Sequence, residues 1–362
     1  ISSHNGFNIT CNNIKDGAID VTVSGGTAAY TYAWTTTDGT GLDAAAEDQT
    51  GLGPGTYSLT VTDSKNCPIT KDFIITEPPV LNISEVISSH NGFNITCNNV
   101  KDGAIDVTVT GGTSVYTYAW TTADGSGWDA TAEDQTGLGP GTYLLNVTDS
   151  NSCTIATQTY VITEPPALTI SEVISSHNGF NITCKDANDG SIDVTVGGGT
   201  SVYTYAWTTA DGSGLDATAE DQEKLGPGTY LLDVTDSNSC PITTQTYVIT
   251  EPPGISVSET LSSHNGFNIT CKDANDGSID LTVTGGIITG DDYTYSWTTT
   301  NGSGLDPATK NQSGLGPGTY TVIISDSNSC PITKNYLITE PEIVSITQTL
   351  SSHNGFNITC KD

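Results

Sequence analysis

The chain has 362 residues, and its 41 acidic residues against 10 lysines, with no arginine, give a formal net charge of −31. Nucleic acids and anionic membranes are bound through clusters of Lys and Arg, which this sequence lacks, so we expect no nucleic-acid partner. No run of 18 apolar residues occurs, and we therefore expect no membrane insertion. Abundant Gly, Thr, Tyr and Val indicate strands and turns.

An internal repeat of about 87 residues organises the chain. The segment Ser-Ser-His-Asn-Gly-Phe-Asn-Ile-Thr-Cys occurs five times, with its histidine at positions 4, 90, 177, 264 and 353. A period of this length is too long for a solenoid turn and suits one small domain. The predicted domains are residues 1–79, whose first strand is truncated, then 80–166, 167–253 and 254–341, with 342–362 beginning a fifth. We expect the sequence to be a piece of a longer tandem array.

The second repeat illustrates the expected strands in chain order. Alternating apolar residues predict a strand over 104–109, and Gly111-Gly112 ends it. An aromatic strand is expected at 116–120, and further strands at 131–138, 142–148 and 153–163. Glu164-Pro165-Pro166 is expected to act as a stiff joint, after which residues 168–173 begin the next repeat.

Two aromatic positions favour an immunoglobulin-like fold. Each repeat has about seven short predicted strands and a central Trp, such as Trp120, and Tyr143 follows a Pro-Gly turn where a tyrosine corner belongs. We read the stripe of Tyr116, Tyr118 and Trp120 as core packing in preference to a carbohydrate-stacking platform. The predicted fold is therefore all-β, a tandem array of immunoglobulin-like β-sandwich domains that forms an extended rod.

Four motifs resemble a known family. They are Asp189 to Gly199, the aromatic segment Tyr203 to Trp207, Gly226 to Tyr230, and Val234 to Cys240. Together they resemble the SprB repeats of Bacteroidetes surface proteins, which are related in architecture to PKD domains. The resemblance implies a place in a very large secreted adhesin, of the kind moved along the cell surface in gliding motility and exported by the type IX system. Each repeat departs from the family by a longer first-strand region, Ser-Ser-His-Asn-Gly-Phe-Asn.

The cysteines fall two to a repeat, which favours disulfides over metal ligands. A pair within one repeat, such as Cys97 with Cys153, would join opposite ends of the sandwich across a strand of roughly 20 Å, whereas a disulfide needs Cα atoms within about 7 Å. We prefer pairing across the junctions between successive repeats, with pairing within a repeat and free thiols as alternatives. The preferred pairs are Cys11 to Cys153, Cys97 to Cys240, and Cys184 to Cys330, with Cys67, Cys271 and Cys360 pairing outside this sequence.

Two acidic loops are candidate calcium sites, and no other cofactor is expected. One contains Asp186, Asn188, Asp189 and Asp193, and the other contains Asp211 and Asp216. Hard cations take several oxygen ligands on a tight Gly turn, which both loops offer. The alternative is a solvated turn in which Asp and Asn bond to nearby backbone.

No catalytic constellation is evident, so we expect no enzyme. The recurring histidine has no second ligand or triad partner at a fixed spacing and is interpreted as a turn residue. We expect an extracellular, cell-surface location and a mechanical role as the stalk of an adhesin. The alternatives are a multivalent glycan- or protein-binding module and a self-assembling extracellular filament. Expected partners are neighbouring repeats of the same chain, and beyond them other copies, surface polysaccharide or substratum.

Overall fold

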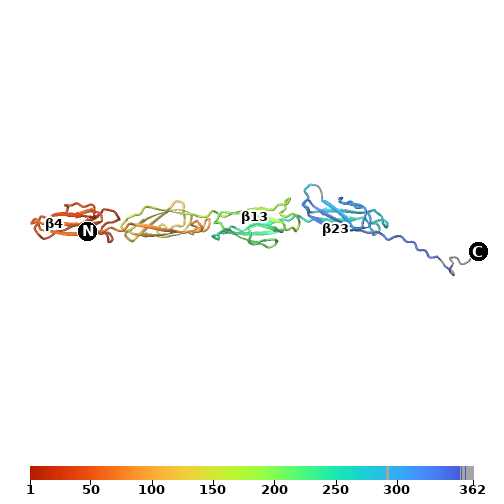
Figure 1. The fold of residues 1–362 in the computed structure, drawn as a ribbon, viewed down its shortest axis with the longest axis horizontal. Helices are drawn as coiled ribbons and strands as arrows, with labels where there is room; N and C mark the ends of the chain where they lie inside the picture. The colour runs from red at the N-terminus through yellow and green to blue at the C-terminus, as the bar shows by residue number, and fades with distance from the viewer. Residues whose placement is uncertain (291–292, 351, 353–354, 356–362) are drawn as a thin grey trace, which may run out of the picture. The chain divides into compact units, whose positions relative to one another are not determined.

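The computed structural model describes residues 1–290, 293–350, 352 and 355. Those residues form 23 β-strands and no helix (Figure 1). The chain divides into two compact units, one made of Ile1–Thr169, Val196–Tyr203 and Thr235–Ile242 and the other of Ile170–Thr195, Thr204–Val234 and Thr243–Asp362. The dividing line runs through the third repeat, so each of the junctions between repeats lies within one unit.

The second repeat contains two three-stranded antiparallel sheets. One has the order β6 (Asn82–Ile87), β7 (Gly103–Thr110), β9 (Gln135–Leu138), and the other β11 (Gln158–Ile162), β10 (Gly141–Thr148), β8 (Thr117–Thr122). In chain order this is the A-B-E and C-F-G arrangement of an immunoglobulin sandwich without its D strand. The strand order therefore confirms the predicted fold class.

The core lies between the two sheets. Ile105 and Val107 of β7 face Trp120 of β8 and Leu145 of β10, and all four side chains are buried. Alternation along β7 and β10 places every second residue in this core, as the period of a strand requires. The Trp120 ring packs against Tyr160 with its centroid 5.6 Å away, where antibody domains have a Trp against a disulfide.

A tyrosine corner fixes the entry to β10. The Tyr143 side chain is fully buried, and its hydroxyl donates to the carbonyl of Gly139, four residues upstream, at 2.8 Å. The same oxygen accepts from the Ser126 backbone N–H at 2.9 Å, which ties the loop after β8 to the corner. The bond recurs at Tyr57, Tyr230 and Tyr320, as the turn motif predicts.

The third and fourth repeats have the same topology. The third contains β12 (Thr169–Ile174), β13 (Gly190–Gly197), β14 (Thr204–Thr209), β15 (Gln222–Leu225), β16 (Gly228–Thr235) and β17 (Gln245–Ile249). The fourth contains β18 (Ser256–Leu261), β19 (Gly277–Thr284), β20 (Thr294–Thr299), β21 (Gln312–Leu315), β22 (Gly318–Ser325) and β23 (Pro331–Ile338).

The first repeat has five strands, β1 (Gly17–Ile19), β2 (Thr31–Thr36), β3 (Gln49–Leu52), β4 (Gly55–Thr62) and β5 (Pro68–Ile75). Its sheet β2-β4-β5 is complete, whereas β1 pairs only with β3 among the described residues. No described strand of this repeat corresponds to β6.

The segment Ser-Ser-His-Asn-Gly-Phe-Asn is a tight turn and does not extend the first strand, which corrects the expectation. In the second repeat β6 ends at Ile87, and the backbone groups of His90 and Phe93 then bond to each other. Asn91 and Gly92 between them have φ angles of 48° and 93°, a left-handed conformation that a strand cannot contain. The chain then returns to the core at buried Ile95.

Candidate functional site: the junctions between repeats

Three disulfide bonds join successive repeats. The bonded pairs are Cys11 with Cys153, Cys97 with Cys240, and Cys184 with Cys330, with Cα atoms 5.6–5.7 Å apart. These are the pairings that the sequence analysis prefers. In each pair the first cysteine follows the His-Asn-Gly turn of one repeat, and the second follows the turn after the fifth strand of the next repeat. Cys67 and Cys271 are exposed thiols, and Cys360 lies outside the described residues.

A pair of asparagines lies beside each disulfide. Asn91, in the left-handed turn of the second repeat, donates to the side-chain oxygen of Asn238 in the third at 2.6 Å. Asn238 in turn donates to the backbone carbonyl of Thr96 at 2.9 Å, next to Cys97. The bonds recur as Asn5 to Asn151 to Thr10 and as Asn178 to Asn328 to Thr183. The first repeat has Lys65 at the position of Asn151, Asn238 and Asn328.

A buried aspartate holds the turn that carries the second cysteine. One oxygen of Asp149 accepts from the backbone N–H of Asn151 and of Cys153, both at 2.9 Å, and the other accepts from the Thr113 N–H at 2.8 Å. Burial favours a raised pKa for Asp149, but the donors from Thr113 and Cys153 outweigh it and hold the pKa below its ordinary value. The pKa of Asp236 in the third repeat is lowered in the same way, and its carboxylate orients Cys240.

The linker between the first two repeats passes against a pair of glycines. The Gly112 N–H donates to the Pro79 carbonyl at 2.9 Å. At Gly111, where φ is 78°, a Cβ atom would lie only 1.8 Å from the Val80 carbonyl oxygen, so no other residue fits without moving the linker. Equivalent bonds from Gly199 and Gly286 to Pro166 and Pro253 hold the next two linkers. The glycine pair that the sequence analysis read only as the end of a strand therefore positions the linker.

The other end of each linker is held by its glutamate. The Glu164 carboxylate accepts from the Asn99 backbone N–H at 2.7 Å, and the Asn98 side chain donates to the Pro165 carbonyl at 3.0 Å. In the third repeat, Lys185 occupies the position of Asn98, and its ammonium group lies 3.3 Å from the Glu251 carboxylate. The linker is thus bonded to the repeat it leaves as well as to the repeat it enters.

The first group of calcium candidates is mostly engaged with nearby chain. The Asp186 backbone N–H donates to Glu251 at 2.8 Å, and the Asp186 carboxylate lies 3.2 Å from Lys185. Asp189 accepts from Thr183, Asn188 accepts from Ser213, and Asp193 is exposed on β13.

The second group of calcium candidates has local partners too. Asp211 accepts from the Thr229 N–H at 2.8 Å, and Asp216 accepts from the Thr218 N–H at 3.0 Å, a bond that lowers the pKa of Asp216. Over the residues that the structure describes, no group of three or more His, Cys, Asp or Glu side chains could hold a metal ion. These contacts are those of the alternative, backbone-bonded turn, and calcium binding stays a prediction.

The junction asparagines are the functional residues that sequence reasoning missed. The signal was present, since Asn5, Asn91 and Asn178 recur in the most regular segment of the repeat. The His-Asn-Gly triplet was interpreted as a turn, which is correct for its backbone. Its asparagine side chain also reaches the next repeat, and that role depends on how two surfaces meet.

The described residues contain no helix with the length and apolarity needed to cross a membrane.

The fold resembles several solved structures at low identity. The three N-terminal domains of the bacteriophage RB49 highly immunogenic outer capsid protein Hoc are 15% identical, with a TM-score of 0.33, covering 74% of this chain and all of that one. The N-terminal eight immunoglobulin domains of Down syndrome cell adhesion molecule are 9% identical, with a TM-score of 0.24, covering 91% and 58%. The insect immune protein hemolin is 10% identical, with a TM-score of 0.23, covering 91% and 96%. The fold assignment itself rests on the strand order described above.

A family model matches the chain four times, and no curated protein matches it. The model is that of the SprB repeat, and it covers residues 7–39, 93–125, 180–212 and 267–302. Each match begins at or beside the phenylalanine of the His-Asn-Gly turn and continues into the loop after the Trp strand. The SprB repeat model therefore matches once within each of the four immunoglobulin-like sandwiches.

Proposed function

We propose that this chain is a load-bearing segment of an extracellular surface adhesin, in which SprB repeats act as a non-catalytic stalk. The family match supports an adhesin-like repeat region, and disulfides are typical of proteins that work in an oxidising compartment. The observation that carries the mechanical role is the disulfide at each of three successive junctions. Transport in gliding motility and export by the type IX system are what the family resemblance adds to this proposal.

The disulfides overlap along the sequence, and this overlap limits how far the chain can be stretched. Cys153 and Cys184 are separated by only 31 residues, yet the bonds that end at them reach back to Cys11 and forward to Cys330. A pulling force applied to the two ends is therefore transmitted through about 73 residues of backbone and two disulfides. The loaded backbone is that of residues 1–11, 153–184 and 330–362. The remaining backbone lies in cross-linked loops that carry no load, even if a sandwich unfolds.

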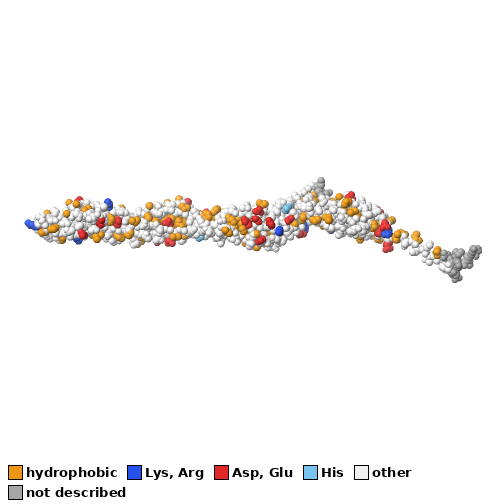
Figure 2. Space-filling model, in the orientation of Figure 1, with side chains coloured by type: hydrophobic (Ala, Val, Ile, Leu, Met, Phe, Trp, Pro, Cys, Tyr) orange, Lys and Arg blue, Asp and Glu red, His pale blue; other side chains and the backbone are white. Residues whose placement is uncertain are grey.

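The charge fits a long exposed array. Acidic side chains occur over each of the four repeats in the face that Figure 2 shows, and lysines are few. A surface with net charge far from zero resists association and precipitation. This distribution supports a solubility role for the charge, since the chain would be held at high local density on a cell surface.

Single-molecule force spectroscopy of the oxidised chain, pulled by its two ends, tests the proposal. At about 3.5 Å per residue, the loaded path predicts a maximum length of about 270 Å when oxidised and about 1,260 Å when reduced. Equal lengths in the two states would contradict a load-bearing role for the disulfides.

Two double variants sharpen the measurement. Replacing Cys97 and Cys240 by serine removes a disulfide that is not on the shortest path, so the maximum length should stay at about 270 Å. Replacing Cys184 and Cys330 removes a disulfide that is on the shortest path. The shortest path then has about 188 residues and two disulfides and reaches about 670 Å. The first pair is therefore the matched control for the second.

A further inference from the structure

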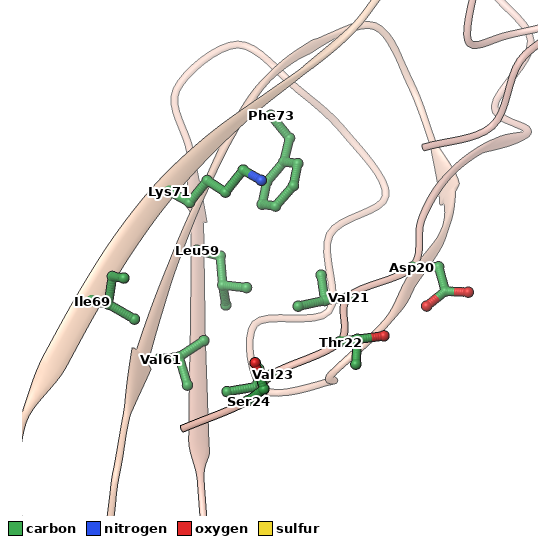
Figure 3. Close-up of a pocket in the computed structure, with 10 residues that line it drawn as sticks. All are labelled: Asp20, Val21, Thr22, Val23, Ser24, Leu59, Val61, Ile69, Lys71 and Phe73. Carbon is green, nitrogen blue, oxygen red and sulfur yellow. The ribbon is translucent and has the colours of Figure 1, made fainter. Parts of the chain in front are cut away.

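The reactive groups of this chain lie in its turns. A pocket of about 310 Å³ in the first repeat is lined mostly by aliphatic side chains such as Val21 and Leu59 (Figure 3). The one amine beside it, that of Lys71, lies 5.1 Å from the centre of the Phe73 ring and is thus engaged in a cation–π contact. The six Asn-Gly dipeptides of the sequence, in contrast, can react without any partner molecule.

Five of these dipeptides belong to the His-Asn-Gly turns. The backbone nitrogen that follows an asparagine can attack the side-chain amide, and glycine hinders this attack least because it has no Cβ. Asn91-Gly92 is the two-residue loop of a turn that the bonds between His90 and Phe93 close. Both loop residues are exposed. The turn therefore presents to water a dipeptide that is prone to deamidation.

The nitrogen that would attack is unhindered in this turn. Among the described residues, nothing accepts a hydrogen bond from the Gly92 N–H, and a Cβ atom on Gly92 would have no neighbour within 4 Å. In the sixth dipeptide, Asn301-Gly302, the Gly302 N–H donates to the Thr299 hydroxyl at 2.9 Å. An amide nitrogen must lose its proton before it attacks, and a hydrogen bond retains that proton. We therefore expect the two dipeptides to differ in reactivity.

The closed junction holds the amide group that would leave. The Asn91 Nδ2 donates both of its hydrogens across the junction, to the Asn238 Oδ1 at 2.6 Å and to the Ser237 hydroxyl at 3.1 Å. Asn5 in the first repeat donates both of its amide hydrogens in the same way. These bonds restrict rotation of the side chain. Attack by the Gly92 nitrogen therefore requires that the junction first opens locally.

Deamidation would remove the donor on which the junction depends. Its product is a carboxylate, which has no hydrogen to donate and would face the Asn238 Oδ1, another acceptor. The Asn238 amide could turn its Nδ2 toward the carboxylate. That group, however, donates to the Thr96 carbonyl at 2.9 Å, and this bond would then be lost. Either way the modified junction has fewer hydrogen bonds than the original one.

The same product is harmless at Asn301. The Asn301 Oδ1 accepts from the Thr319 N–H at 2.9 Å. The other three repeats have an aspartate at this position, and each accepts the equivalent bond at 2.8 Å; these residues are Asp38, Asp124 and Asp211. Deamidation of Asn301 would thus give a side chain that the fold already accommodates, so Asn301 is an internal control for the junction asparagines.

We propose that each junction asparagine deamidates when its junction opens, and that the product prevents the junction hydrogen bonds from re-forming. The Gly92 nitrogen bonds to the Asn91 Cγ, the Cγ–Nδ2 bond breaks, and the proton of the Gly92 N–H passes through water to the departing group, which leaves as ammonia. Water then opens the succinimide at either carbonyl and gives an aspartate or an isoaspartate. The disulfide persists, so the junction is loosened without being broken. This inference is independent of the proposed mechanical role.

Peptide mapping of the 362-residue oxidised chain, aged in mildly alkaline buffer, tests whether opening controls the reaction. Asn238→Ala removes the partner of Asn91, and the turn tolerates other residues there, since the first repeat has Lys65 with the same backbone bond to its aspartate. Deamidation at Asn91 should become at least about tenfold faster, because the loss of two hydrogen bonds raises the open population.

Two other asparagines are followed in the same digests. Asn178, whose own junction is unaltered, should keep its rate, and Asn301 should react more slowly than Asn91 does in the variant. The proposal is wrong if Asn91 reacts equally fast in the variant and in the unaltered chain, or stays unmodified in both. It is also wrong if Asn301 reacts as fast as Asn91 of the variant.

A second variant, Asn91→Asp, measures what the product does to the junction. The oxidised chain is treated with limiting reductant, and the thiols that appear are alkylated and identified over time. The Cys97–Cys240 bond should be reduced about tenfold faster, while Cys184–Cys330 keeps its rate. The matched control, Asn301→Asp, should change neither rate. If Asn91→Asp leaves the reduction of Cys97–Cys240 as slow as in this control, deamidation does not loosen the junction and the proposal is overturned.

Discussion

Two tyrosines of the second sandwich differ in what their hydroxyl groups contact. The buried Tyr143 hydroxyl bonds to Gly139 and Ser126, whereas the buried Tyr160 hydroxyl has no hydrogen-bond partner, and burial beside Glu85 raises the pKa of Tyr160 to about 12. The first repeat has Phe73 at the position of Tyr160, so the fold does not need this hydroxyl.

Replacing each tyrosine by phenylalanine should separate the two roles. Tyr143→Phe leaves the Gly139 carbonyl and the Ser126 N–H without their partner and should destabilise the second sandwich by about 1–3 kcal/mol. Tyr160→Phe removes a group with no partner and should be neutral or slightly stabilising. Native-state hydrogen exchange, resolved by repeat, measures both. Equal losses in the two variants would show that the corner hydrogen bonds are unimportant.

Asp149 gives the junction turn a dependence on pH. Because its pKa is lowered in the folded state, its contribution to stability is complete above the unfolded value near 4 and is lost as the pH falls through the folded value. Asp149→Asn should lower the free energy of unfolding by about 1–3 kcal/mol at pH 7. An amide has only one accepting oxygen and cannot accept from the backbone N–H groups of Thr113, Asn151 and Cys153 together. The substitution should also reduce the loss of stability between pH 5 and pH 3. Hydrogen exchange of the second repeat, corrected for intrinsic rates, checks this, and an unchanged pH dependence would contradict it.

At the scale of the elements, the strands were predictable and the contacts between loops were not. Alternation located β7 and β10 within one residue, because each has one face in the core. The expected strand at 131–138 is shortened to β9 at 135–138, since buried Gln135 begins the strand by bonding back to Asp129. The expected strand at 153–163 is shortened to β11 at 158–162 for a similar reason, as the Asp149 carboxylate holds Cys153 in the preceding turn.

The junction disulfides follow from a distance argument on the sandwich topology, which places the two cysteines of one repeat at opposite ends. The asparagine pair and the glycine that the linker crosses could not be predicted in this way. Both depend on the exact approach of two repeats, which no periodicity within a single repeat records. Asn91, for example, has the same turn conformation whether or not Asn238 is beside it.

Two glycines in left-handed conformation should respond differently to alanine. Gly92→Ala places its Cβ in open space and should cost only the backbone strain, about 1–2 kcal/mol. Gly111→Ala would push its Cβ into the Val80 carbonyl and should in addition detach the linker, seen as faster hydrogen exchange at residues 77–81. If exchange at the linker is as slow in Gly111→Ala as in Gly92→Ala, the glycine does not hold the linker.

At the scale of the whole molecule, each repeat is stabilised both by its own core and by its junctions with neighbouring repeats. Each sandwich is small and buries a limited core, so bonds that constrain the unfolded chain contribute more to its stability than they would in a large domain. Reduction should therefore lower the melting temperature of the chain, by about 4–8 °C for each kcal/mol lost per sandwich. Calorimetry of oxidised and reduced chains measures this, and identical melting temperatures would refute it.

The central claim is that each disulfide joins one repeat to the next, and peptide mapping without reduction tests it most directly. The chain is digested under conditions that prevent disulfide exchange, and the cross-linked peptides are identified by mass spectrometry. We expect the Cys97 peptide to be recovered joined to the Cys240 peptide, with Cys11 joined to Cys153 and Cys184 to Cys330. Recovery of Cys97 joined to Cys153, within a single repeat, would contradict it.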